Sequence, residues 1–340
     1  MKKGLDTLYL LYRLCGQEKR NTHTNGETKM LNALERTFGV ELEFICDNSN
    51  ALANHINQQC GQNTVQVEHY NHTTRPYWKL ITDSSVHATT PADRRARLKG
   101  FELVSPILKG EAGLSAIRAI MDAIDTYTGT AKINKSCGYH LHLQADDLNL
   151  KQLKNIMKAQ CKYEWVLDCF QPQSRRANNA HYTQSAVRHF GNGRDLSSIE
   201  NTGFSMIDSA RDQTQLANLM QTRGRYCKLN FQNFASVGTI EVRHGAGTLD
   251  GEKITNWVKL YTGIFSGFAD ARLRPSKLNW EETNSNNANG NLTLDKAIRR
   301  LFKHIRTEDG AINRDLRKFY QTRAKAMGFE TDYFPRPLMY

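Results

Sequence analysis

Hydrophobic and polar residues alternate strictly in one short stretch near residue 40, and the other predictions build on this stretch. Val40, Leu42 and Phe44 alternate with Glu41 and Glu43. Successive side chains of a β-strand point to opposite faces, so the apolar residues would face a core and the two glutamates would share the other face. Two unpaired carboxylates this close repel each other, and a divalent cation would relieve the repulsion. The alternative is a half-buried strand with a solvated acidic face.

The same alternation recurs along the chain and predicts further strands near 64–68, 77–82, 100–106, 138–143, 226–231 and 238–243. Helical spacing of apolar residues predicts helices at 49–59, at 114–124, from a cap at Asp146 or Asp147 to Phe170, at 252–269, and near 293–305 and 311–327. The strands come in pairs with helices between them, which differs from a regular β-α-β-α alternation. We therefore predict an α+β fold with a largely antiparallel sheet.

Three segments fall outside this pattern. Residues 1–35 have loop or hairpin composition and are predicted to be an N-terminal extension of a single domain that covers 36–335. Residues 171–225 are predicted to be a polar connector with weak structure, and loops of this length are usually functional or disordered. The Asn-rich segment 284–291 is predicted to be a linker or surface loop.

The composition narrows the class of protein. The net charge is +12 and the pI is about 9.3, which favours anionic partners such as a nucleotide, a polyphosphate, an acidic substrate or nucleic acid, although a generally cationic surface would explain it too. The seven cysteines form no C-x-x-C pair, which is typical of a reducing compartment. No secretory pattern or membrane-length apolar run occurs, so we predict a cytoplasmic protein that does not enter a membrane.

Two later strands strengthen the metal interpretation of the first. His140 and His142 would share one face of their strand, and Glu241 and Arg243 would share one face of another. If one sheet holds all three strands, these side chains meet on a single surface. Carboxylates with histidine suit Mg²⁺ or Mn²⁺, and arginine suits a phosphoryl oxygen, so the set favours metal-assisted phosphoryl chemistry. The alternative is an ion-paired structural network, and no Gly-rich phosphate loop is present.

The order of these motifs is similar to that of the amidoligase family, a branch of the carboxylate–amine ligases with the glutamine synthetase-like fold. The resemblance runs from about residue 37 to about residue 270. It rests on Gly39–Phe44, Trp78 with Thr82–Ser85, Phe101–Pro106, Cys137–His142, Arg225 with Leu229–Asn230, and Thr239–Arg243.

The resemblance implies a curved, largely antiparallel sheet with helices packed on its outer face. It also implies an ATP-dependent ligase, in which a carboxylate takes the γ-phosphate of ATP and an amine then displaces phosphate to form an amide. The substrates would be small-molecule, peptide or protein amines and carboxylates, with ATP and Mg²⁺ (or Mn²⁺) as cofactors. The roles that it implies are metal ligands at Glu41, Glu43, Glu102, His140 and Glu241; phosphoryl clamps at Arg225 and Arg243; nucleotide or phosphate contacts at His142 and Asn230; an amine-orienting group at Asp83; and substrate contacts at Arg175, Arg176, Asn179 and Tyr182.

Glutamine synthetase has more acidic ligands in its middle segment than this sequence offers, so the number of metal ions is open.

Two rival functions stay open at this point. A phosphotransferase on the same fold would use the same metal and phosphate groups without ligation. A basic nucleic-acid-binding protein would use the Arg94–Arg97 cluster instead, and nucleic acid is an optional partner of the ligase as well.

Overall fold

The computed structural model describes residues 33, 35–191, 196–221, 224–275 and 293–329, and it divides them into two compact units. The first unit comprises 34–143 and 245–258, and the second comprises 144–244 and the chain from 259 onward. Most of the predicted N-terminal extension and all of 284–291 lie outside the described residues. Within those residues, none of the helices has both the length and the apolar character needed to cross a membrane.

The first unit contains an open sheet in the order β2-β3-β4-β1-β7. The strands β2 and β3 are parallel, and the other neighbours in this order are antiparallel, as are the short strands β5 and β6 that also pair with β1. The predicted α+β class with a largely antiparallel sheet is therefore confirmed. The strands are β1 (Thr37–Cys46), β2 (Val65–Val67), β3 (Trp78–Thr82), β4 (Lys99–Val104), β5 (Leu108–Lys109), β6 (Ala131–Lys132) and β7 (Gly138–Gln144).

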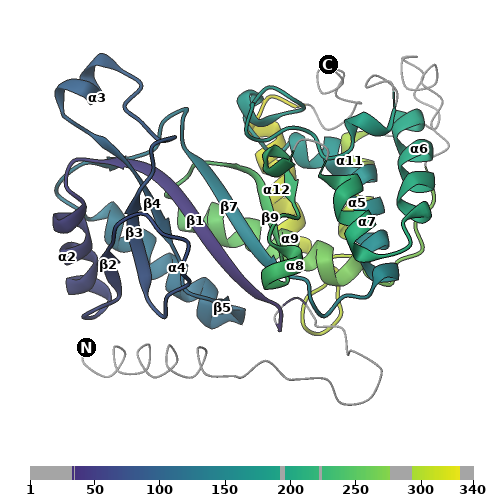
Figure 1. Cartoon of the computed structure of the whole chain (residues 1–340), viewed down its shortest axis with the longest axis horizontal. Helices are drawn as coiled ribbons and strands as arrows, with labels where there is room; N and C mark the ends of the chain where they lie inside the picture. The colour runs from purple at the N-terminus through teal and green to yellow at the C-terminus, as the bar shows by residue number, and fades with distance from the viewer. Residues whose placement is uncertain (1–32, 34, 192–195, 222–223, 276–292, 330–340) are drawn as a thin grey trace. The chain divides into compact units, whose positions relative to one another are not determined.

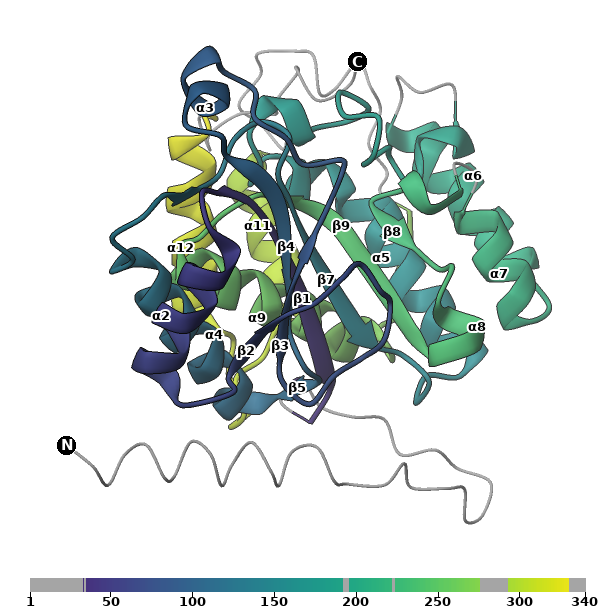
Figure 2. The same ribbon diagram turned by 60° about the vertical axis from the view of Figure 1, so that its left-hand side comes forward.

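Helices cover the apolar face of this sheet. Figures 1 and 2 both show α2 (Ser49–Cys60) and α4 (Gly110–Asp125) on the same side of the strands. The ring of Phe38 reaches α4 at Gly113, and the hydroxyl of Tyr139 donates to the backbone oxygen of Ile254 in α9 (Gly251–Phe268) at 3.3 Å. The opposite, polar face of the sheet is therefore the face that carries the predicted site.

The second unit is mostly helical and is built around α5. The last six residues of α5, from 163 to 168, are all buried, so helices must pack around it on more than one side. Its packing partners include α6, α7 and α11. The helices are α5 (Leu150–Asp168), α6 (Leu196–Ser209), α7 (Gln213–Met220), α8 (Phe234–Val237), α11 (Leu294–Phe302) and α12 (Arg314–Ala326), with the antiparallel strands β8 (Leu229–Asn230) and β9 (Thr239–Ala246).

Two sequence-based predictions of local structure were wrong. The segment 171–225 is not weakly structured, because it contains α6 and α7, which bury Phe204, Ile207, Leu216 and Met220. These apolar positions are too few to give a clear helical period in a polar sequence. The cap of α5 is Asn149 rather than Asp146 or Asp147, since its side-chain oxygen accepts from the amide of Gln152 at 3.0 Å.

Candidate metal and phosphate site

Strand register brings five of the predicted site residues onto the polar face of the first unit's sheet. Glu41 of β1 lies opposite His140 of β7, and Glu43 lies opposite Glu102 of β4. His142 lies two residues further along β7 than His140, opposite Gly39. Side chains directly opposite in an antiparallel pair share a face at about 5 Å between Cβ atoms, so the pairing alone makes this a compact group.

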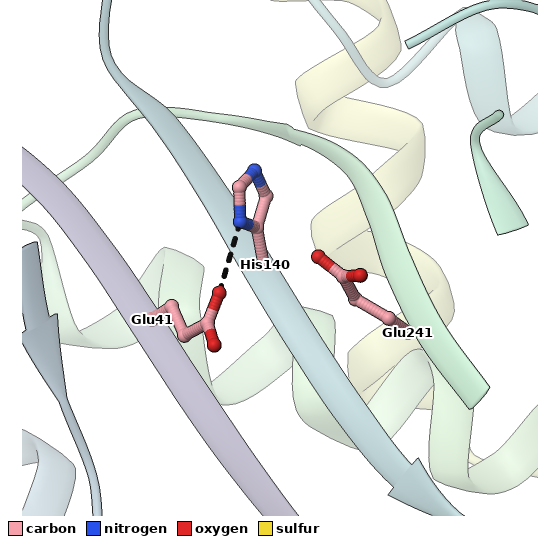
Figure 3. Close-up of side chains that lie close together, drawn as sticks. All are labelled: Glu41, His140 and Glu241. Carbon is pink, nitrogen blue, oxygen red and sulfur yellow. Dashed lines mark hydrogen bonds and ion pairs between the residues drawn. The ribbon is translucent and has the colours of Figure 1, made fainter. Parts of the chain in front are cut away.

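The side chains of this group touch one another. The Nδ1 atom of His140 lies 3.1 Å from Glu41 Oε2, an interaction drawn in Figure 3, and His140 Nε2 lies 3.6 Å from Glu43 Oε1. His142 Nε2 lies 2.9 Å from the other oxygen of Glu41. Ligand atoms of Glu43, Glu102 and His140 all lie within 4.8 Å of one another, which is close enough for one cation to contact all three.

The pKa values of two carboxyl groups in this cluster are shifted in opposite directions. Burial, together with the negative charges of Glu41, Glu43 and Asp83, raises the pKa of Glu102 well above its ordinary value. Burial also opposes the charge of Glu41, but the neighbouring His142 and His140 hold its pKa well below the ordinary value. Glu102 therefore favours its protonated form more than an ordinary glutamate does.

Backbone contacts fix the orientation of two members of the cluster. The amide of Gly138 donates to Glu43 Oε2 at 2.5 Å, so the carboxylate of Glu43 is held at the start of β7. At the end of β3, Asp83 Oδ1 accepts from both the amide and the hydroxyl of Ser85, at 2.7 and 2.8 Å. Asp83 is close enough to affect the pKa of Glu102, so it borders the cluster from the β3 side.

Sequence reasoning missed Lys79, which is 3% exposed on the same face of the sheet. Its strand neighbour in β4 is Val104, and Ile81 two residues on lies opposite Glu102. The Nζ atom donates to the backbone oxygens of Asn71 and Thr73 at 2.7 and 3.0 Å. Burial lowers the pKa of Lys79. The alternation of Lys79 with Trp78 and Leu80 is the signal that could have placed this lysine on the polar face.

In the second unit, Glu241 and Arg243 lie together on one face of β9. Arg243 Nη1 and Glu241 Oε1 form an ion pair at 2.5 Å, and the side-chain amide of Asn230 donates to the other oxygen of Glu241 at 2.6 Å. Glu241 is buried, and within the described residues the buried Nε of Arg243 has no hydrogen-bond partner. That Nε is a donor that a phosphoryl or carboxylate oxygen could accept from.

The remaining predicted residues lie in the connector region of the second unit. Arg225 is exposed and its guanidinium lies 5.4 Å from the ring centre of Tyr226, which also packs edge-on to Tyr182. Arg176 donates to the backbone oxygens of Gln171 and Met327, and Asn179 donates to that of Gln173. Arg176 and Asn179 thus hold the loop's shape, while Arg225 and Tyr182 offer exposed groups. Arg175 is half-buried in the same loop.

A buried charged network, which the sequence did not reveal, also lies in the second unit. Asp168 Oδ1 contacts both Lys228 Nζ and His244 Nε2 at 2.6 Å, and Lys228 also lies 3.5 Å from Glu164. Burial works against the charge of Asp168, yet Lys228 and His244 lower the pKa of Asp168 to about 2. Burial and the charge of Lys228 lower the pKa of His244. The network joins α5 to His244, which follows Arg243 in β9, and to Lys228, whose backbone oxygen accepts from the amide of Arg243 at 2.9 Å.

The comparisons with known proteins assign the family. A buried cluster of carboxylates and histidine with shifted pKa values is typical of a functional site. A family model described as "putative amidoligase enzyme" matches residues 34–265, which is more than half of the chain, and it includes residues of both units. The chain belongs to this family, and a ligase is the class of enzyme that the family's description gives. No curated protein matches the sequence.

Proposed function

We propose that this protein is an ATP-dependent carboxylate–amine ligase with a glutamine synthetase-like catalytic fold. The observation that carries the proposal is the cluster of Glu43, Glu102 and His140 on the polar face of the sheet, whose ligand atoms lie within 4.8 Å of one another. Membership of the amidoligase family supports the reaction class. A protein that used this face only for packing would gain nothing from opposing two carboxylates there.

The donor set fits a hard divalent cation. Glu43, Glu102 and the Nε2 of His140 would hold Mg²⁺ or Mn²⁺, and Glu41 would orient the imidazole through Nδ1, as outer carboxylates do at many metal sites. Glu41 and Glu241 are also proposed metal ligands, as the family resemblance implies. When bound, the metal would neutralise the phosphate oxygens of ATP and withdraw charge from the γ-phosphorus.

The reaction proceeds in two displacements. A carboxylate oxygen of the first substrate attacks the γ-phosphorus of ATP, and ADP leaves with the electron pair of the broken P–O bond. The amine nitrogen of the second substrate then attacks the acyl carbon and inorganic phosphate leaves. Asp83 is the proposed acceptor of the amine's proton, and its carboxylate is already oriented by Ser85.

The second unit supplies the proposed anion contacts. Arg243 would donate its free Nε to the transferred phosphoryl group, and Arg225 would provide a second positive charge. His142 and Asn230 are the proposed neighbours of the nucleotide phosphates. The proposed substrate contacts come from one loop and are Arg175, Arg176, Asn179 and Tyr182. Arg176 and Asn179 would act indirectly, because their hydrogen bonds hold the shape of this loop.

Hydroxylamine tests the proposal without knowledge of the natural amine, because it converts an acyl phosphate into a hydroxamate, which gives a coloured complex with ferric iron. We expect the full chain with ATP, Mg²⁺ and a mixture of amino acids and glutamate-containing peptides to form hydroxamate, and to lose this activity on omission of ATP. Arg243→Ala should lower the rate by at least about 100-fold, which is typical for loss of one transition-state charge contact. A phosphorylated product formed without hydroxamate would instead establish the phosphotransferase.

A further inference from the structure

An arm formed by residues 83–98 connects β3 to β4 and lies against the polar face beside the metal cluster. Val86 and Leu98 of the arm form a buried cluster with Ile45 and Cys137. Ile45 follows Glu43 by two residues on the same face of β1, which is about 7 Å along a strand. The base of the arm is therefore one wall of the proposed site.

The contact between arm and sheet is close enough to require glycine. A Cβ atom at Gly100, the strand partner of Ile45, would lie 1.8 Å from the backbone oxygen of Val86. No side chain fits at that distance, so glycine at position 100 is what allows the backbone of the arm to approach the sheet this closely. The base of the arm is therefore packed directly against β4.

The tip of the arm is α3 (Pro91–Arg95), and it has its own stabilising contacts. Thr90 and Asp93 form a capping box, and the other oxygen of Asp93 pairs with Lys132 at 2.7 Å. Figures 1 and 2 show α3 at the end of a projection beyond β4. A short helix held in this way presents its outer side chains from a fixed base.

Four cationic side chains lie in α3 and in the residues that follow it. Arg94, Arg95, Arg97 and Lys99 are exposed, and among the residues that the structure describes none of the four forms an ion pair or hydrogen bond through its side chain. The nearby carboxylate of Asp93 is buried and already paired with Lys132. Four positive charges therefore face solvent together.

Arg97 adds a second indication. Its φ is 55°, in the left-handed region where glycine or asparagine is the usual residue at a helix end. The amides of Arg97 and Leu98 bond back to Arg94 and Asp93, which is the hydrogen-bond pattern of a helix stop. A glycine at this position would have a less strained backbone than arginine. What arginine adds is an exposed guanidinium group.

We propose that the arm binds an acidic peptide, a chain with several glutamate or aspartate side chains, and delivers one of its carboxylates to the metal cluster. This inference rests on the proposed ligase function, since that function makes a carboxylate the group to be activated. Arginines form bidentate pairs with carboxylates, and three of them at the tip of one arm suit a polycarboxylate. Residues 83–99 contain no Phe, Tyr or Trp side chain on which a base could stack, which favours peptide over single-stranded nucleic acid.

Fluorescence anisotropy of a labelled ten-residue peptide of alternating glutamate and glycine tests the arm. The full chain is titrated in low salt with EDTA and without nucleotide, so the result does not depend on ligase activity. We expect the triple variant Arg94→Ala, Arg95→Ala, Arg97→Ala to bind at least about tenfold more weakly, as three surface ion pairs would give. The matched control removes three exposed cations from α12, Arg314, Lys318 and Lys325, and should bind within about twofold of wild type.

Arg97→Gly separates binding from folding. It relieves the left-handed backbone, so the variant should resist urea at least as well as wild type while binding the peptide about two- to threefold more weakly. Wild-type binding by the arm variant, equal losses in the arm and α12 variants, or binding of a 20-nucleotide single-stranded DNA without binding of the peptide would each overturn the proposal. Loss of hydroxamate formation with peptide binding intact would instead count against the ligase function alone.

Discussion

Replacement of Glu43 by glutamine should lower the affinity for Mn²⁺ by at least about tenfold and the rate of hydroxamate formation by at least about 100-fold. Glutamine keeps the shape of the side chain and can still accept from the amide of Gly138, so the strand pairing should survive. What it removes is one of the two opposed carboxylates that would hold the cation. Calorimetric titration of Mn²⁺ measures the first loss.

The control for this variant is Glu111→Gln in the first turn of α4. Glu111 is 57% exposed and lies outside the cluster, so the same chemical change there should leave the Mn²⁺ affinity within about twofold of wild type. Both variants should keep the circular dichroism spectrum of wild type. Unchanged Mn²⁺ binding in a folded Glu43→Gln protein would remove the metal cluster from the site.

Replacement of Asp168 by asparagine should destabilise the protein by about 3–5 kcal/mol, the usual cost of removing one partner of a buried ion pair. Lys228 is fully buried, and its closest carboxylate oxygen is Asp168 Oδ1 at 2.6 Å. Asp208→Asn is the matched control, because Asp208 makes an equally short pair with Lys158 but is 59% exposed. The control should change the unfolding free energy by less than about 1 kcal/mol.

The pKa of Asp168 also predicts a pH dependence for that contribution. The folded pKa is about 2 against an ordinary value of 3.8, so the folded state binds fewer protons between these values. The stabilisation is therefore complete above about pH 5 and falls as the pH decreases toward 2. Urea unfolding at pH 7 and pH 3 should show the gap between wild type and Asp168→Asn narrowing at the lower pH. A gap of equal size at both values would contradict the assigned ion pair.

Local alternation was enough to predict the polar face of the first unit. The pattern around Glu41 and Glu43, and the one around His140 and His142, follow from the two-residue period of a strand, and the structure pairs those strands directly. The two-residue period fixes the face on which a side chain lies, but it does not say which strands are neighbours in the sheet. The opposition of Glu43 and Glu102 therefore emerged only from the register of β1 with β4.

The features that sequence reasoning missed depend on long-range packing. Asp168 and Lys228 are 60 residues apart in sequence, and each alone is typical of a solvated surface. Lys79 has the alternation that marks a polar face, but a lysine between Trp78 and Leu80 gives no sign that its ammonium will be enclosed by a loop. The helices α6 and α7 were hidden because their buried residues are sparse within a polar segment.

Calorimetric titration of a non-hydrolysable ATP analogue into the wild-type chain, first with Mg²⁺ and then with EDTA, tests the central claim most directly. In the proposed site Glu43 and Glu102 would hold the cation, which would supply positive charge for the phosphates, so binding should be present with Mg²⁺ and at least about tenfold weaker with EDTA. Binding of equal strength with and without the metal, or no binding in either condition, would contradict a metal–nucleotide site on this face of the sheet.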